Sequence, residues 1–198
     1  SLLNRMSGNN SDEKFANMKA AFGFFMTHPG KKHLFMGQDI GEFDEWNVSR
    51  EIEWNLLDYE EHKWFHNSVK DLLALYKEQP ALYTFDSVEE GFEWINCISA
   101  NENIVVFLRK TKKAEETLLV LINFENVPRK NYKIGVPFEG KYKEIFNSDA
   151  EKYGGFDFRN TRCYNSDKDE CDGRDNSIKV KVPPLGISIF KCTPTELA

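Results

Sequence analysis

The spacing of apolar residues changes near residues 85–90, and this change limits the fold more than any other feature. Before it, apolar residues recur every three or four positions, which is the spacing of helices with one buried face. After it, they occur in short runs with a period of two, which is the spacing of β-strands. The sequence therefore predicts an α+β fold with a domain boundary at 85–90.

The first part of the chain is predicted to form two helices with one strand between them. The first helix has a buried face that starts at Phe15, and Pro29 ends it. The second runs from Asp58 to a stop at Pro80. Residues 33–36 are too few and too apolar for a half-exposed strand, so we expect a buried strand with a parallel neighbour on each side.

The second part is predicted to be an antiparallel β-sandwich, because short strands alternate with turns rich in Asn, Gly, Pro and Lys. The predicted strands are residues 92–98, 104–109, 118–124, 132–136, 142–147, 178–182 and 186–191. The insert at 153–176 is polar and long for a loop, and we expect part of it to be mobile.

A series of motifs runs along nearly the whole chain. It comprises Ser1-Leu2-Leu3-Asn4-Arg5-Met6, Leu34-Phe35-Met36-Gly37-Gln38, Glu45-Trp46-Asn47, Gly91-Phe92-Glu93-Trp94-Ile95, Asn147-Ser148-Asp149-Ala150, Tyr153-Gly154-Gly155 and Pro183-Pro184-Leu185-Gly186. In order and spacing, this series closely resembles the glycogen (1,4-α-glucan) branching enzymes of the α-amylase superfamily.

The resemblance implies that residues 1–85 are the C-terminal remnant of a catalytic (β/α)8 TIM barrel, contributing helix, strand and helix. It implies that residues 86–198 are the C-terminal all-β sandwich of the superfamily. A complete barrel needs about 250 residues, more than the 198 present, so we expect the chain to be a fragment.

The implied activity of the parent enzyme is to cleave α-1,4-glucan chains and transfer them to 6-hydroxyls, making the α-1,6 branches of glycogen without a cofactor. Such retaining chemistry needs a carboxylate nucleophile and a carboxylic acid. In the family these groups precede the segment that matches Ser1 to Met6. We therefore expect no catalytic residue in this chain, and we expect the isolated chain to be inactive and either to self-associate or to pack its helices on the sandwich.

The polar loop after the predicted strand holds the candidate substrate-binding residues. The resemblance places Asp39, Trp46 and Asn47 at the rim of the barrel, where Trp46 could offer a flat apolar face to a sugar ring. The family usually carries Glu-Phe where this chain has Asp39-Ile40. For Glu42 and Asp44 we favour the simpler interpretation of a solvated acidic loop.

Tryptophans outside this loop have two interpretations. Trp94, on the first predicted strand, is a further candidate for substrate binding, although a tryptophan on a strand is more often a core residue. Trp54 and Trp64 are predicted to be packing residues.

Several classes of function are disfavoured. A formal net charge of −6 argues against nucleic-acid binding, and no run approaches the ~20 apolar residues of a membrane span. A signal peptide is not apparent, so a cytoplasmic protein is expected. The four cysteines (Cys97, Cys163, Cys171 and Cys192) are not spaced as a disulfide framework and are predicted to be reduced.

No metal site is predicted. His62 and His66 stand four residues apart, but the HExxH pattern is absent, so we expect a solvated helix face. The acidic run from Asp167 has its glycine at position seven and Ile178 at position twelve, which excludes an EF-hand.

Expected partners are therefore an α-glucan such as glycogen or amylose, and the rest of the catalytic barrel. An alternative is a non-catalytic glucan-binding or scaffolding module. A related superfamily hydrolase fits the motifs less well.

Overall fold

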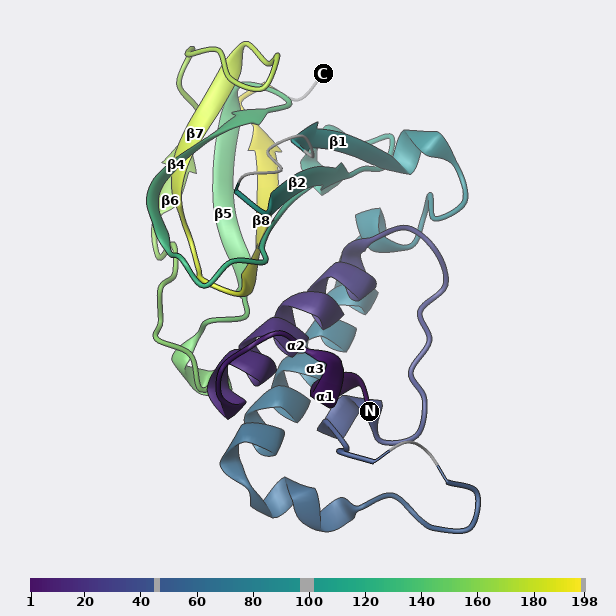
Figure 1. Ribbon diagram of the computed structural model, residues 1–198. Helices are drawn as coiled ribbons and strands as arrows, with labels where there is room; N and C mark the ends of the chain where they lie inside the picture. The colour runs from purple at the N-terminus through teal and green to yellow at the C-terminus, as the bar shows by residue number, and fades with distance from the viewer. Residues whose placement is uncertain (45–46, 97–101, 197–198) are drawn as a thin grey trace.

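The computed structural model describes residues 1–44, 47–96 and 102–196, and it places helices first and antiparallel strands second (Figure 1). The helices are α1 (Leu2–Arg5), α2 (Ser11–Thr27) and α3 (Glu60–Glu78). The strands are β1 (Phe92–Asn96), β2 (Ile104–Arg109), β3 (Leu118–Asn123), β4 (Arg129–Val136), β5 (Gly140–Asn147), β6 (Cys163–Asn165), β7 (Asn176–Val182) and β8 (Gly186–Pro194). The predicted α+β fold is confirmed.

The two long helices begin and end where local chemistry requires. The Asn10 side chain caps α2 by accepting a hydrogen bond from Glu13 N at 2.9 Å. Pro29 and Pro80 lie just beyond the ends of α2 and α3, because proline cannot supply the N–H that the next turn needs.

The strand predicted at residues 33–36 does not form. Residues 31–35 are irregular and run alongside the helices (Figure 1). A buried parallel strand needs a parallel neighbour for its backbone hydrogen bonds, and every strand pair in the described part of the chain is antiparallel. The prediction was wrong because apolar composition does not provide a pairing partner.

The strands form two sheets. Six strands make one sheet in the order β1-β2-β3-β8-β5-β6, and β4 pairs with β7 in a separate ribbon. All seven predicted strands have a counterpart in the structure, although residues 97 and 98 of the first one lie outside the described residues. The short strand β6 was missed, because it pairs three residues of the insert that was predicted to be a loop.

Both faces of the six-stranded sheet are buried. On β3, Leu118, Val120 and Ile122 pack into a core shared with α2 and α3, whereas Leu119 and Leu121 pack against the β4–β7 ribbon. This is why β3 is apolar throughout instead of alternating. The helices therefore pack directly on the sandwich, one of the two outcomes expected from the sequence.

Helix α2 approaches the sheet very closely at Gly23. A Cβ atom at Gly23 would lie 2.5 Å from Cγ2 of Ile187 on β8, well inside van der Waals contact. Only glycine lets the α2 backbone lie this close to the sheet.

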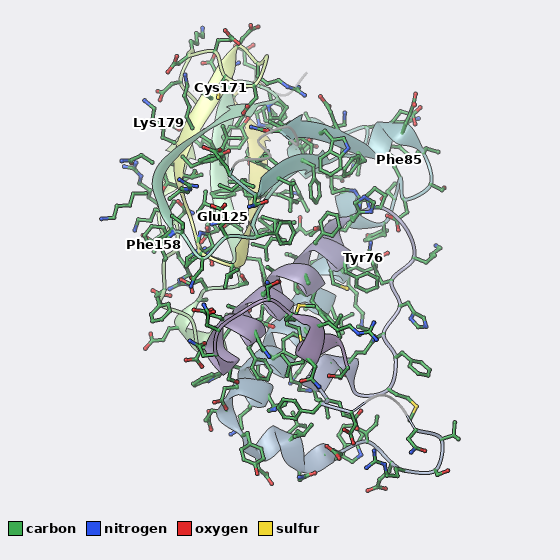
Figure 2. The ribbon with its side chains drawn as sticks, in the orientation of Figure 1. Tyr76, Phe85, Glu125, Phe158, Cys171 and Lys179 are labelled. Atoms are coloured by element: carbon green, nitrogen blue, oxygen red, sulfur yellow. The ribbon has the colours of Figure 1, made fainter. Side chains whose placement is uncertain are left out.

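A buried arginine joins the helices to the sandwich. Arg109 is inaccessible to solvent, and its Nη1 donates to the Thr27 carbonyl at 2.6 Å while Nη2 pairs with Asp86 at 2.7 Å. Its Nε donates to the Gly91 carbonyl at 3.2 Å. Tyr76, which Figure 2 shows near the end of α3, donates its hydroxyl to Asp86 at 3.3 Å.

Candidate functional site

The loop with the sequence-predicted site residues is shaped by two glycines. Gly37 and Gly41 have φ values of +74° and +72° and bracket a short 3-10 turn, η1 (Gln38–Ile40). A side chain is strained at such angles, and a Cβ at Gly37 would lie 2.2 Å from the Glu42 carboxylate. Both glycines are therefore required for this turn.

Two histidines of α3 hold this turn in place. His62 Nδ1 lies 2.7 Å from the Ile40 carbonyl, and because a carbonyl only accepts, Nδ1 carries the proton. His62 is 4% exposed and packs edge-on against Phe15 and Phe43. His66 Nδ1 lies 3.2 Å from the Asp39 carbonyl. The prediction of a solvated helix face was wrong for His62, because these loop contacts involve residues more than twenty positions away.

The predicted loop residues have different surroundings. The Asp39 carboxylate lies 3.4 Å from His66 Nδ1, so it is partly engaged with α3. Asn47 is exposed, and its side chain accepts a hydrogen bond from Ser49 N at 2.8 Å. Trp46 lies outside the described residues.

The acidic side chains of the loop also differ. Asp44 forms an exposed ion pair with Arg50 at 2.7 Å, which fits the predicted solvated loop. Glu42 is only half-exposed, and its carboxylate accepts a hydrogen bond from Glu53 N at 3.2 Å. A cavity of about 200 Å³ lies beside this loop. It is lined by Ser1, Leu2, Arg5, Met18, Phe35, Met36, Gln38, Glu42 and Asp44.

Trp94 is exposed and lies apart from the loop. It is 42% exposed on β1, with ring centroids 4.8 Å from Phe92 and 5.7 Å from Phe107, both edge-on. The interpretation of Trp94 as a core residue was therefore wrong: Trp94 lies on an edge strand, and its contacts with Phe92 and Phe107 leave it exposed. The interpretation of Trp54 as a packing residue was wrong too, since it is 57% exposed. Figure 1 places β1 at the opposite end of the molecule from η1, so the structure does not bring Trp94 and Asp39 together.

Ion pairs of Glu93, the residue before Trp94 on β1, hold this strand in place. Glu93 pairs with Lys110 at 2.6 Å and with Arg174. Partial burial raises the pKa of Glu93, but hydrogen bonds from these two cations outweigh it and hold the pKa below its usual range. The carboxylate is therefore ionised and pairs the β1 edge with the 171–174 turn.

A second concave region was not predicted from the sequence. It is a groove of about 650 Å³ between the N-terminal halves of α2 and α3 and the segment 149–156. Its lining comprises Asn10, Asp12, Glu13, Phe15, Ala16, Lys19, Glu61, Trp64, Asn126, Asp149, Tyr153, Gly154, Gly155, Phe156, Pro184 and Leu185. We name it the helix–sandwich groove. The sequence signal was the motif Tyr153-Gly154-Gly155, which had served only as a family marker.

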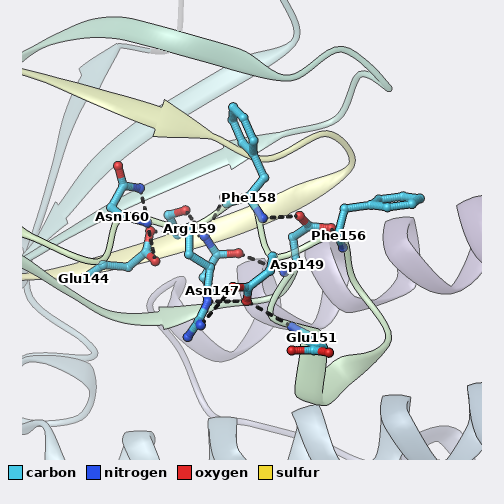
Figure 3. Close-up of polar contacts among 10 residues, drawn as sticks. Glu144, Asn147, Asp149, Glu151, Phe156, Phe158, Arg159 and Asn160 are labelled. Atoms are coloured by element: carbon cyan, nitrogen blue, oxygen red, sulfur yellow. Dashed lines mark hydrogen bonds and ion pairs between the residues drawn. The ribbon is translucent and has the colours of Figure 1, made fainter.

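One wall of the helix–sandwich groove is the segment 149–156, and a buried carboxylate organises it (Figure 3). The Asp149 side chain accepts hydrogen bonds from Phe156 N at 3.1 Å and Phe158 N at 2.9 Å. The backbone N of Asp149 donates to the Asn147 side chain at 2.8 Å. Two backbone donors on one carboxylate fix the segment around its short 3-10 helix η6 (Glu151–Tyr153).

Comparison with protein families decides the relationship. The model for the alpha amylase C-terminal all-beta domain matches residues 94–193. The chain belongs to this family. The alpha amylase C-terminal domain accounts for the sandwich from β1 to β8, and the helices precede it.

Curated relatives of this alpha amylase C-terminal domain protein include branching enzymes. The chain is 41% identical over 99% of its length to 1,4-alpha-glucan branching enzyme GlgB of Bacillus cereus strain AH820, covering 30% of that protein. It is 43% identical over 96% of its length to GlgB of Prochlorococcus marinus strain MIT 9515, covering 25%. The chain is thus homologous to the C-terminal part of GlgB, and the resemblance noted from the motifs is confirmed.

Solved structures share the fold at low identity. AmyP in complex with maltose aligns with a TM-score of 0.63 at 14% identity, over 98% of this chain and 38% of AmyP. Ttha1563 from Thermus thermophilus aligns with a TM-score of 0.62 at 15% identity, over 92% of this chain and 32% of that one. These matches confirm helices followed by an antiparallel all-β domain.

The described residues hold neither a metal-binding cluster nor a membrane-spanning helix. Within 1–44, 47–96 and 102–196, no group of three or more His, Cys, Asp or Glu side chains is placed to hold a metal ion. Over the same ranges, no helix has the length and apolar character needed to cross a membrane.

Proposed function

We propose that this chain is the C-terminal part of a glycogen branching enzyme that cleaves α-1,4-glucan chains and transfers them to 6-hydroxyls. The observation that carries the proposal is 41% identity along 99% of the chain to proteins named 1,4-alpha-glucan branching enzyme. Because the chain spans about 30% of their length, the catalytic carboxylates are proposed to lie in the remainder, and the chain alone is proposed to be inactive.

In this proposal, residues 1–85 are the end of the catalytic barrel and residues 86–198 are the sandwich. Exposed apolar side chains support a covering barrel. Six large ones lie within the first 60 residues: Leu2, Phe35, Phe43, Val48, Trp54 and Tyr59. They are half of the twelve large apolar side chains that are exposed in the described residues, as expected if another body covers this part of the chain. Without that body, the same surface would favour self-association.

A cytoplasmic location is part of the proposal. Cys163, Cys171 and Cys192 are all free thiols, as the sequence predicted, and free thiols suit a reducing compartment. Cys97 lies outside the described residues.

The test is a chimera in which this chain replaces the homologous C-terminal part of Bacillus cereus GlgB. The chimera should branch amylose, as measured by the fall in iodine absorbance, whereas the chain alone and a GlgB lacking this part should not. A folded chimera without branching activity, or an isolated chain that branches amylose, would contradict the proposal.

We further propose that Asp39, Trp46 and Asn47 shape the sugar groove at the barrel rim, and that Trp94 is a separate glucan contact. The exposed face of Trp94 on an edge strand supports this role. It also favours the second candidate function, a glucan-binding module. Trp94→Ala should abolish part of the retardation of the chain in an amylopectin gel. Unchanged migration would rule Trp94 out.

A further inference from the structure

The helix–sandwich groove has an aromatic side chain that the fold does not use. Phe156 is 90% exposed, the most of any large apolar side chain in the described part of the chain. Figure 3 shows its ring pointing away from the Asp149 network. A single exposed apolar side chain is common on protein surfaces, but Phe156 lines the groove, where its ring is free to contact a ligand.

The backbone that presents Phe156 is held from several sides. Phe156 N donates to the Asp149 carboxylate at 3.1 Å, and Asp157 N donates to the Asp149 carbonyl at 2.8 Å. Gly155 N donates to the Ala150 carbonyl at 3.3 Å. A ring on a fixed backbone loses little conformational entropy when a ligand stacks on it.

The same segment is anchored to both helices. The Tyr153 hydroxyl donates to Asp71 of α3 at 2.5 Å, and Lys152 pairs with Asp71 at 2.7 Å. Lys19 of α2, which is buried, donates from Nζ to the Tyr153 carbonyl at 2.7 Å. The groove is therefore formed in advance of any ligand.

The groove lining selects the chemical class of ligand. Among its described residues, Lys19 is the one cation, and its ammonium is already used inside the protein, so an anion has no free counter-charge. The Glu13 carboxylate already accepts from Asn126 at 3.1 Å and from Asn9 N at 2.7 Å, so it is not a vacant cation ligand. Carboxylate and amide groups beside an aromatic face suit a neutral ligand with many hydroxyls and an apolar face, which is a sugar.

We propose that the helix–sandwich groove binds a short segment of α-glucan, with Phe156 stacking on a sugar ring and the lining carboxylates and amides accepting and donating hydroxyl hydrogen bonds. Its volume of about 650 Å³ is within the usual range for ligand pockets. That the sugar is an α-glucan rests on the proposed function. The groove is distinct from Trp94 and from the loop at residues 37–47.

The experiment measures the Kd of maltoheptaose for the groove by NMR titration of the Trp64 indole N–H, because Trp64 lines the groove and glucan bound at Trp94 or at the loop does not enter this value. Phe156→Ala should raise the Kd about two- to twelve-fold, because a stacked ring contributes about 0.5–1.5 kcal/mol. Tyr83→Ala removes another exposed aromatic ring, outside the groove, and should leave the Kd unchanged. Since Phe156 is 90% exposed, the variant should melt at the wild-type temperature.

The outcomes separate this inference from the proposed function. The proposal that the groove binds α-glucan would be contradicted if Phe156→Ala kept the wild-type Kd, or if maltoheptaose did not shift the Trp64 signal. Neither result would affect the chimera test. An inactive chimera together with weakened binding in Phe156→Ala would contradict the proposed branching function and support sugar binding in the groove. Equal affinity for cellohexaose would contradict the α-glucan assignment.

Discussion

At the scale of single residues, Arg109 has the largest expected effect on stability. It is fully buried, and its guanidinium bonds to Asp86 and to backbone carbonyls of two other segments. Arg109→Met would leave the nearly buried Asp86 carboxylate without its cationic partner, with only the Tyr76 hydroxyl among the contacts described above. We expect a loss of about 3–5 kcal/mol in the free energy of unfolding, measured by urea denaturation.

The neighbouring residue provides a matched control. Lys110 pairs with Glu93 at 2.6 Å, but both side chains are about one-third exposed. Lys110→Met should therefore cost less than about 1 kcal/mol. Similar losses for the two variants would show that Arg109 does not join the two parts of the chain.

Lys19 makes stability depend on pH. Burial lowers the pKa of Lys19 to about 8, although Asp149 and Asp12 raise it. In the unfolded chain the pKa is about 10.4, so between these values the unfolded state binds more protons. The free energy of unfolding should rise with pH in this window, by about 1–2 kcal/mol from pH 7.5 to 9.5.

Two variants separate the contributions of Lys19 and Lys32 to the pH dependence of stability. Burial also lowers the pKa of Lys32 to about 8, so it acts in the same direction. Lys19→Met should reduce the slope of the free energy of unfolding against pH. Lys32→Met should reduce the same slope by the part that Lys32 contributes. A slope that Lys19→Met leaves at the wild-type value would contradict the assignment.

At the scale of elements, the segment 149–156 depends on a close contact between Gly154 and α3. Gly154 has φ +71°, and a Cβ there would lie 2.2 Å from the Trp64 ring. Gly173 has nearly the same φ, +69°, with nothing within 4 Å of a Cβ. Gly173→Ala should cost about 1–2 kcal/mol for backbone strain alone.

Gly154→Ala adds a steric clash to the same strain. We expect it to cost about 1–3 kcal/mol more than Gly173→Ala in urea denaturation, and to shift Trp64 fluorescence. If the two alanine variants lost equal stability, the packing of the segment on α3 would be disproved.

At the scale of the whole molecule, the helices and the sandwich share one core. Ile187 and Ile189 of β8 and Phe22 and Phe65 of the helices belong to the same buried cluster. We expect a single unfolding transition, with helix loss followed by circular dichroism at 222 nm and tertiary structure by tryptophan fluorescence.

A core variant tests this coupling. Ile187→Ala should cost about 2–5 kcal/mol and move the midpoints of both signals together. Separate midpoints in the wild type, or a variant that moves only one of them, would mean that the two parts fold independently.

Local pattern predicted most of the elements, because the period of apolar residues depends only on neighbours in sequence. It failed where the outcome depends on residues that are distant in sequence. Residues 33–36 have strand composition but no parallel strand beside them. Trp94 has an ordinary strand position in the sequence, and neither its exposure nor the place of β1 at the sheet edge can be seen there.

The candidate sites also differ in whether their residues are close together or far apart in sequence. The loop at residues 37–47 is continuous in sequence, so its polar content could be seen directly. The helix–sandwich groove is assembled from α2, α3 and the segment 149–156, which lie far apart in sequence. Its organiser, Asp149, acts through backbone N–H groups, which leave no trace in the residue types that it contacts.

The contact between Gly23 and Ile187 has a consequence for how such chains evolve. A side chain at position 23 requires a smaller residue at position 187, because its Cβ would lie 2.5 Å from Cγ2 of Ile187. Substitutions at these sites must therefore arrive in pairs. Recombination between relatives at residues 85–90 would take positions 23 and 187 from different parents. The recombinant would keep the close contact between α2 and β8 only if the two parents carry compatible residues at these positions.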